Sequence, residues 1–206
     1  MSSPTAEKLL ETTNAFLNAF GSLDPEALSA TQANNYTHVF APASLGSGEP
    51  FTRQSLGEYL VKLQGILECF RLDFKRILPN PHLRQSVVWA GSETIFLEHV
   101  KDGDRAEWKF EGEHIFILSM DEAGEKVVDI VEFLDSKKSE ILYGLISRAF
   151  QTKEALEAGT SNTESYNGSC SQDGRRDFTS MIANLVWANI VTNIIHLNML
   201  RPEYRS

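Results

Sequence analysis

The sequence predicts an α+β protein in which helices come first and an antiparallel sheet follows. Two observations support this prediction. Apolar residues recur at helical spacing up to about residue 67, and from Cys69 onward apolar and charged residues alternate with the two-residue period of a half-buried strand. Short turn sequences separate the later segments, which favours an antiparallel meander over a doubly wound sheet.

Helix-start signals divide the first part of the chain. Ser3 followed by Pro4 suits the cap and the first position of a helix, and Asp24-Pro25 repeats the pattern. Thr52 opens a third helical segment. We therefore expect helices over residues 4–21, 25–30 and 52–67, with a strand at 36–40 between the second and the third.

The alternating segments after Cys69 are separated by turn sequences. Asp102-Gly103 and residues 121–125 indicate tight turns. Gly91 interrupts one segment, and we expect a β-bulge there. Asp135 is expected to cap a last helix that continues to about residue 150. The expected strands cover residues 69–75, 85–100, 106–119 and 126–134.

We expect one pocket domain over residues 1–151, a polar linker over 152–177 and an apolar helix over 178–206. The linker segment is rich in Ser, Thr, Asn, Gly and charge. Residues 178–200 carry no charge and as a helix would span about 34 Å, enough for a bilayer core. The Asn and His residues inside it make insertion costly. Three roles stay open: a packed or oligomeric helix, weak membrane association, or a poorly ordered tail.

The charge balance and the motifs argue against several classes of protein. A net charge of −9 argues against nucleic-acid binding, which needs a basic patch. The sequence contains no glycine-rich phosphate loop, no nucleophile elbow and no metal-ligand spacing, so we expect neither a cofactor nor a metal site. The first ten residues lack a secretion signal, and the two cysteines lie far apart. These features predict a cytoplasmic protein, with residues 178–200 as its only segment for membrane association.

Strand alternation places two titratable side chains on the buried face of the expected sheet. Glu132 shares its side of the last strand with aliphatic residues. His114 points inward with the aromatic residues of its own strand, which are Trp108, Phe110 and Phe116. A carboxylate in apolar surroundings has a raised pKa, and an imidazole nearby titrates close to neutrality. Such a pair suits proton removal and return without a cofactor.

The early strand supplies two further candidates. His38 lies just before the Pro42–Gly48 loop, and Tyr36 shares its face of the strand. We expect His38, Glu132, His114 and Tyr36 to form the catalytic group. The residues expected to bind the substrate are Trp108, Phe110, Phe116, Trp89 and Tyr59, with Trp89 in the core.

Each titratable group also has a structural explanation. His114 is also consistent with a core histidine whose hydrogen bonds are satisfied. Glu132 is also consistent with an ion pair to an arginine such as Arg53 or Arg71. The sequence alone does not separate these explanations from the catalytic one.

Three segments carry a resemblance to a known family. They are His38–Gly46, Glu113–Ile117 and Lys126–Ser136. Through them the chain, over about residues 5–151, resembles the SnoaL-like proteins of the nuclear transport factor 2-like superfamily, and in particular small fungal proteins of secondary metabolism.

The resemblance implies a fold, an activity and a site. It implies a cone-shaped sheet wrapped around the N-terminal helices, a deep pocket for a small molecule and a homodimer. It also implies a cofactor-independent isomerase, cyclase or dehydratase, with a hydrolase as a further option, that acts on a polyketide or meroterpenoid intermediate. By position it points to His38 and Glu132, with His114 beside them. The alternative is a non-catalytic ligand-binding or dimerisation module of the same fold.

Overall fold

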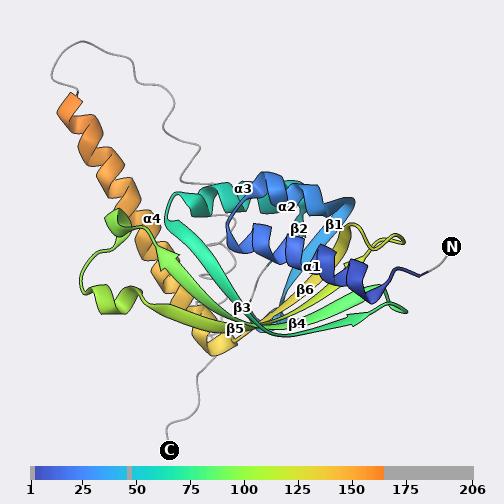
Figure 1. The fold of residues 1–206 in the computed structure, drawn as a ribbon. Helices are drawn as coiled ribbons and strands as arrows, with labels where there is room; N and C mark the ends of the chain where they lie inside the picture. Colours follow the sequence, from blue (N-terminus) through green and yellow to red (C-terminus); the bar gives the residue numbers. More distant parts are fainter. Residues whose placement is uncertain (1–2, 46–47, 165–206) are drawn as a thin grey trace, which may run out of the picture.

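The computed structural model describes residues 3–45 and 48–164 (Figure 1). The helices are α1 (Ala6–Gly21), α2 (Pro25–Thr31), α3 (Arg53–Gln64) and α4 (Ser136–Glu164). The strands are β1 (Gln32–Ala41), β2 (Phe51–Thr52), β3 (Leu67–Asn80), β4 (Gln85–Phe96), β5 (Phe110–Met120) and β6 (Val127–Leu134). Short 3-10 helices are η1 (Ala43–Leu45), η2 (Glu98–Val100) and η3 (Arg105–Trp108).

Side chains with a hydroxyl or carboxyl group cap the N-termini of the first three helices. Thr5, not Ser3, caps α1, because its hydroxyl accepts a hydrogen bond from the backbone N–H of Lys8 at 3.2 Å. Asp24 caps α2 and Thr52 caps α3, as the sequence predicts. The chain therefore enters each helix at a residue that satisfies its free N–H groups.

The strands of the described residues form one six-stranded sheet in the order β2-β1-β6-β5-β4-β3. All neighbours run antiparallel except β1 and β6, which run parallel. In this parallel pair, His38 lies opposite Ile130 and Phe40 opposite Glu132. The first and the last long strands are thus neighbours, which brings together residues that are far apart in the sequence.

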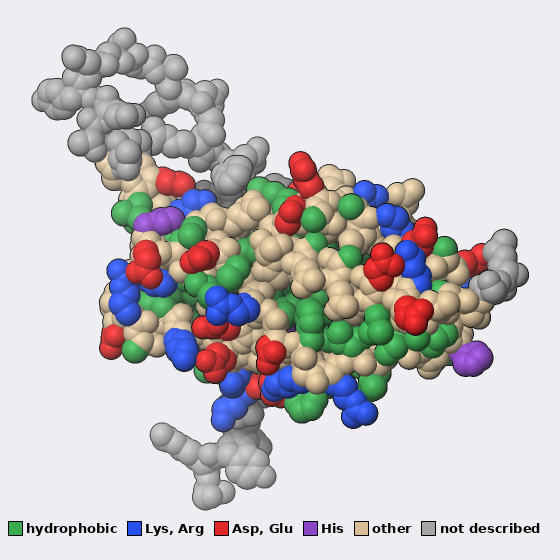
Figure 2. Space-filling model, in the orientation of Figure 1, with side chains coloured by type: hydrophobic (Ala, Val, Ile, Leu, Met, Phe, Trp, Pro, Cys, Tyr) green, Lys and Arg blue, Asp and Glu red, His purple; other side chains and the backbone are tan. Residues whose placement is uncertain are grey.

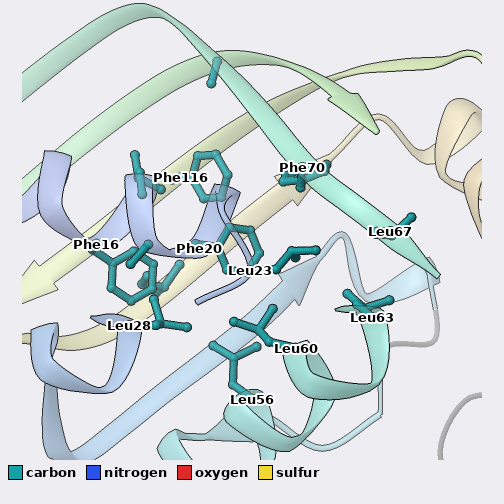
Figure 3. Packing of buried hydrophobic residues seen from close by; sticks show 14 of the residues in the cluster. Phe16, Phe20, Leu23, Leu28, Leu56, Leu60, Leu63, Leu67, Phe70 and Phe116 are labelled. Carbon is teal, nitrogen blue, oxygen red and sulfur yellow. The ribbon is translucent and has the colours of Figure 1, made fainter. Parts of the chain in front are cut away.

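Helices α1, α2 and α3 lie against one face of the curved sheet (Figure 1). Phe20 of α1 makes edge contacts with Phe70 of β3 and Phe116 of β5, at 5.9 and 6.4 Å between ring centroids. Leu56 and Leu60 of α3 are fully buried in the same core (Figure 3). The predicted α+β class, with a curved sheet around the N-terminal helices, is confirmed.

Several predicted strand features need correction. No bulge occurs at Gly91, which pairs regularly with Asp73 and Glu113, and the irregular positions lie in β3 instead. The predicted strand over 85–100 ends at Phe96, and η2 follows it. Trp108 lies in η3, one residue short of a strand that begins only at Phe110.

Helix α4 continues to Glu164, well past the predicted start of the polar linker at residue 152. Ala155, Leu156 and Ala158 favour a helix, and Lys153 lies 3.9 Å from Glu157 one turn away. The segment 152–164 is therefore helical. The rest of the predicted linker and the apolar helix predicted over 178–206 lie outside the described residues. Among the helices that the structure describes, none is long and apolar enough to cross a membrane.

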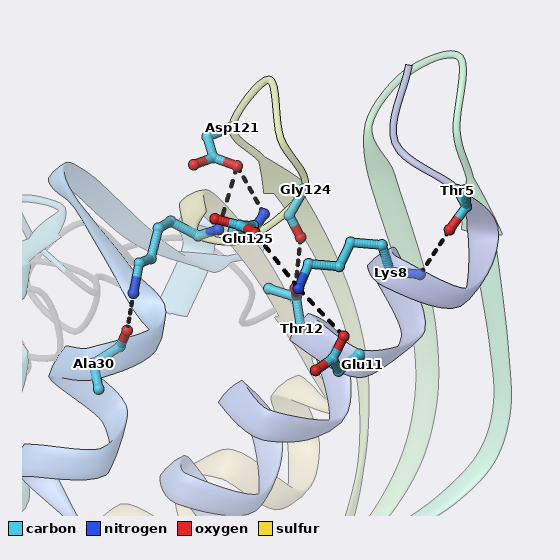
Figure 4. Close-up of polar contacts among 9 residues, drawn as sticks. Thr5, Lys8, Glu11, Thr12, Ala30, Asp121, Gly124 and Glu125 are labelled. Carbon is cyan, nitrogen blue, oxygen red and sulfur yellow. Dashed lines mark hydrogen bonds and ion pairs between the residues drawn. The ribbon is translucent and has the colours of Figure 1, made fainter. Parts of the chain in front are cut away.

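The turn between β5 and β6 anchors helix α1 to the sheet (Figure 4). The hydroxyl of Thr12 donates a hydrogen bond to the carbonyl oxygen of Gly124 at 2.5 Å, and both residues are buried. Gly124 has φ of 72°, and a Cβ built on it would lie 2.7 Å from Cβ of Pro4. Only glycine fits this position without displacing the start of the chain.

We expect Gly124→Ala to lower the free energy of unfolding by about 1–3 kcal/mol, because alanine combines a positive φ with a steric clash against Pro4. Urea denaturation measures the change. The matched control is Gly144→Ala in α4, where a Cβ would meet nothing within 4 Å. The control should be neutral or up to about 1 kcal/mol more stable. Equal stability of the Gly124 variant and the wild type would contradict the prediction.

Candidate active site

Glu132 on β6 lies at the centre of a series of hydrogen-bonded side chains. Its Oε2 is 2.9 Å from Nε2 of His38 on β1, and its Oε1 is 2.8 Å from Nδ1 of His114 on β5. An ionised carboxylate only accepts hydrogen bonds, so both of these ring nitrogens donate. One carboxylate thus binds two imidazoles, one on each oxygen.

A hydroxyl group lies on the far side of each imidazole. The Tyr36 hydroxyl is 3.1 Å from Nδ1 of His38, and the Ser92 hydroxyl on β4 is 2.8 Å from Nε2 of His114. A neutral imidazole that donates from one nitrogen accepts at the other, so both hydroxyls donate. We call the five residues Tyr36, His38, Glu132, His114 and Ser92 the buried network.

The register of the sheet explains why these side chains meet. The network crosses β1, β6, β5 and β4, which are consecutive neighbours. Glu132 lies opposite Phe116, two residues from His114, and His114 lies opposite Ala90, two residues from Ser92. Diagonal pairs of this kind on one face of a sheet are within reach of long side chains.

The buried network is closed off from solvent. The exposed fraction is 0% for His38, 1% for Glu132 and 6% for Ser92, the highest of the five. On the face shown in Figure 2, histidine atoms are visible only near the edges of the molecule, in agreement with the burial of His38 and His114. Aromatic rings surround the imidazoles: Phe116 stacks on His114 at 5.5 Å, and Phe40 lies 4.8 Å from His38.

The pKa of Glu132 differs from the sequence prediction. Burial acts to raise it, but the hydrogen bonds from His114 and His38, with the positive charge of these imidazoles when protonated, outweigh burial. The pKa therefore falls from the ordinary 4.5 to about 2. The prediction of a raised pKa is wrong because it considered the apolar neighbours and not the two hydrogen-bond donors.

The negative charge of Glu132 contributes to the raised pKa values of three tyrosines. Burial raises the pKa of Tyr36, the side chain of Gln32 opposes this shift, and Glu132 adds to it. Burial and the same carboxylate raise the pKa of Tyr143 on α4 to about 12 and also raise that of Tyr59. These phenols stay protonated around neutral pH, and the Tyr36 hydroxyl donates to His38.

The structure brings the four predicted catalytic residues together in the network, although their role remains a prediction. The residues predicted to bind the substrate are divided. Phe116 contacts His114 directly. A Cβ built on Gly112 would lie within 3.2 Å of both Ser92 and Phe110, which places Phe110 beside the network. Tyr59 lies further away: its ring is 5.4 Å from that of Phe51, which contacts Phe40, and Phe40 in turn contacts His38.

Trp89 and Trp108 lie elsewhere. Trp89 is 45% exposed on the opposite face of the sheet, where Lys75 lies over its ring, so the prediction that it belongs to the core and lines the pocket is wrong. An odd position of β4 faces away from the helices whatever its hydrophobicity. Trp108 is buried, but it packs against Phe96 and Arg148.

Neither arginine that the sequence offers as a partner of Glu132 binds it. Arg53 donates to Ser29 at 2.7 Å and to Asn34 at 3.1 Å, and Arg71 pairs with Glu93 at 2.7 Å. The carboxylate is satisfied by imidazoles instead.

Ser92 is the network residue that the sequence analysis missed. It lies at an even position of β4, and the even positions from 86 to 94 are Ser, Val, Ala, Ser and Thr. Small residues give no clear periodic signal. Its position two residues from Ala90, the partner of His114, is the only indication, and it requires the strand register.

Two of the surface clefts in the described part of the chain have no network residue in their lining. One of about 440 Å³ is lined by residues including Gln32, Arg53 and Lys126. The other, of about 610 Å³, lies beside it and shares Arg53. Within residues 3–45 and 48–164, no group of His, Cys, Asp and Glu is arranged to bind a metal ion.

Comparisons with known proteins identify the family. Austinoid biosynthesis clusters protein H of Penicillium brasilianum is 31% identical over 134 residues, which are 65% of this chain and 87% of the relative. The chain belongs to the family of this austinoid biosynthesis protein. A cluster protein H of Aspergillus calidoustus is 30% identical over 133 residues, 65% of this chain and 86% of the relative. No family model matches the sequence.

Solved structures support the family assignment and the fold. AusH of Aspergillus nidulans superposes with a TM-score of 0.54 at 26% identity, covering 65% of this chain and 87% of AusH. At 21% identity, a pinacolase of Penicillium brevicompactum, BvnE, shares the fold with a TM-score of 0.56 over 74% of this chain and 97% of its own. A nuclear transport factor 2-like protein of Burkholderia pseudomallei also shares the fold. Its TM-score is 0.50 at 11% identity, over 64% of this chain and 94% of its own. The relatives of this chain are austinoid biosynthesis proteins, and the predicted SnoaL-like resemblance is confirmed.

We expect the Glu132 carboxyl group to titrate well below its ordinary pKa of 4.5, at about 2. The folded-state pKa is depressed, so the ionised carboxylate stabilises the fold above about pH 4.5, and this stabilisation is lost as the pH falls toward 2. Carbon NMR of the side-chain carboxyl groups measures the titration, and the signal that is absent from Glu132→Gln assigns it. A Glu132 signal that titrates at or above pH 4.5 would contradict the network as described.

Proposed function

We propose that the protein is a cofactor-independent isomerase, cyclase or dehydratase that moves protons within a polyketide or meroterpenoid intermediate. The observation that carries this proposal is the carboxylate of Glu132 with an imidazole on each oxygen. Such an arrangement provides two bases of fixed orientation in a site that excludes water.

The geometry assigns different roles to the carboxylate and the imidazoles. Glu132 is ionised at neutral pH and accepts two hydrogen bonds, so it is a weak base and acts as a positioning residue. The basic electron pair of His114 is on Nε2, where it accepts from Ser92, and that of His38 is on Nδ1, where it accepts from Tyr36. In the proposed reaction one imidazole accepts a proton from the substrate, Glu132 stabilises the imidazolium, and a hydroxyl of Tyr36 or Ser92 donates to the developing enol or alkoxide.

The relatives support the reaction class and the type of substrate. The family members of Penicillium brasilianum and Aspergillus calidoustus are named for austinoid biosynthesis. BvnE, which shares the fold, is a pinacolase. By analogy with the relatives, a polycyclic meroterpenoid intermediate is the proposed substrate. To reach His114, such a substrate has to displace aromatic side chains that pack on it, among them Phe70 and Phe116.

A non-catalytic module is the second candidate, and one observation favours it. All five network residues are paired with one another and buried, and none of them lines either of the two clefts described above. In that case the network serves the fold, and its variants lose stability without any loss of turnover.

We expect Glu132→Gln and His38→Ala to lower turnover about 100-fold or more, since each removes a base or the group that orients it. The assay uses the cluster intermediate that accumulates in a strain without this gene. Circular dichroism and urea denaturation establish that each variant is folded. The matched control is Glu113→Gln, an exposed carboxyl group beside His114 in sequence but on the opposite face. Unchanged turnover in both network variants would overturn the catalytic proposal.

The outer face of the sheet supports the predicted homodimer. Trp89, Ile115 and Phe133 lie side by side on β4, β5 and β6, each 44–45% exposed. Lys75 and Glu113, which pair with each other, border this row with one charge of each sign. A second copy of the chain, turned by a two-fold axis, presents the same mixed border, so we propose that the two copies meet here.

We expect the wild type to sediment as a dimer and Ile115→Glu to sediment as a folded monomer, because a charge at the centre of an apolar interface has no partner. Analytical ultracentrifugation gives the masses. Leu83→Glu, in the turn between β3 and β4, is the control and should remain dimeric. A monomeric wild type, or a dimer that survives Ile115→Glu, would contradict this interface.

A further inference from the structure

Three members of the buried network form a unit of their own. Ser92 Oγ lies 2.8 Å from His114 Nε2, and His114 Nδ1 lies 2.8 Å from Glu132 Oε1. The three side chains come from β4, β5 and β6, which are adjacent strands of a rigid sheet. A hydroxyl, an imidazole and a carboxylate thus lie in line, with both ring nitrogens of the imidazole engaged.

The hydrogen bonds from Ser92 to His114 and from His114 to Glu132 run in the direction that activates the serine hydroxyl. Glu132 is ionised and accepts from Nδ1, so Nε2 of the neutral imidazole has the free electron pair. The Ser92 hydroxyl therefore points its proton at a base that a carboxylate orients from behind. Serine, histidine and an acidic residue in this order form a nucleophilic triad, which is recognised by geometry and not by sequence spacing.

A second observation at the same place indicates a ligand. Thr94 lies two residues from Ser92 on the inward face of β4 and is 3% exposed. Within the part of the chain that the structure describes, its hydroxyl oxygen has no hydrogen-bond partner. A buried hydroxyl without a partner costs free energy, and a bound carbonyl oxygen would accept its proton. Such a donor near a nucleophile stabilises the oxyanion of acyl transfer.

We propose that Ser92, His114 and Glu132 form a triad that transfers acyl groups from carboxylic esters, with Thr94 as a hydrogen-bond donor to the carbonyl oxygen. This activity goes beyond the proposed proton transfers, because the protein forms a covalent bond to the substrate. It shares His114 and Glu132 with them, but it can be tested without the natural substrate.

The proposed reaction balances with groups that are present. Ser92 Oγ bonds to the carbonyl carbon of the ester while its proton moves to His114 Nε2. The bond from that carbon to the alcohol oxygen then breaks, and the departing alcohol takes the proton from Nε2. Water, or a hydroxyl group of the substrate itself, attacks the acyl group on Ser92. The attacking group passes its proton to His114 Nε2, the bond between the acyl carbon and Ser92 Oγ breaks, and Ser92 takes the proton back from Nε2.

The test uses two small probes on the full-length protein: a fluorophosphonate, which bonds to activated serine oxygens with loss of fluoride, and p-nitrophenyl acetate. We expect mass spectrometry to find the phosphonyl group on the peptide that contains Ser92. We also expect Ser92→Ala to abolish labelling, and His114→Ala and Glu132→Gln to slow it about 100-fold or more. Thr94→Val should slow p-nitrophenyl acetate hydrolysis about 100-fold.

Ser86→Ala is the matched control. Ser86 lies on the same face of β4, is fully buried and has no hydrogen-bond partner among the described residues, so its removal should leave labelling unchanged. Absence of label on Ser92, or a label that survives in Glu132→Gln at the wild-type rate, would overturn the triad. If Ser92→Ala does not fold, the labelled peptide of the wild type decides the question. Labelled Ser92 with unchanged turnover of the cluster intermediate in Glu132→Gln would instead refute only the proton transfers.

Discussion

A single buried carboxylate determines how the buried network is arranged. Taking Glu132 out of water costs several kcal/mol, while each charge-assisted hydrogen bond returns about 1.5–3 kcal/mol. Two such bonds from His38 and His114 are therefore about what is needed to hold the carboxylate inside the sheet. The partners depend on it equally, because the carboxylate fixes which nitrogen of each ring carries the proton. The ring nitrogen without a proton is an acceptor, and for this reason a hydroxyl donor, Tyr36 or Ser92, lies beside it.

This arrangement moves the reactive positions away from the acid. Both carboxylate oxygens accept from an imidazole, and the basic electron pairs of the two rings lie on their outer nitrogens. Each outer nitrogen faces a hydroxyl, on β1 at one end and on β4 at the other. The buried network therefore has a similar imidazole–hydroxyl pair on each side of the charged carboxylate. The aromatic rings of Phe40 and Phe116 pack on the two imidazoles and exclude water from both pairs.

Local signals in the sequence predicted the helices and part of the site. Asp24 and Thr52 cap helices through contacts within three residues, and alternation in the later strands placed His114 and Glu132 on one face. The sequence predictions that were wrong or incomplete concern features that depend on residues distant in the sequence. The face that Trp89 occupies, the partners that lower the pKa of Glu132 and the position of Ser92 beside His114 all require the strand register. Hydrophobicity suggested the wrong face for Trp89, and a small serine gave no signal.

The parallel pairing of β1 with β6 has a consequence for how the chain folds. His38 and Glu132 are 94 residues apart in sequence, so their contact closes a loop of more than half of the described residues. Contacts of such long range raise the contact order, which slows folding, because the entropy of loop closure is lost before the contacts form. The contact of Glu132 with His114 spans only 18 residues, whereas its contact with His38 spans 94, so the full arrangement needs both a local pairing and a distant one.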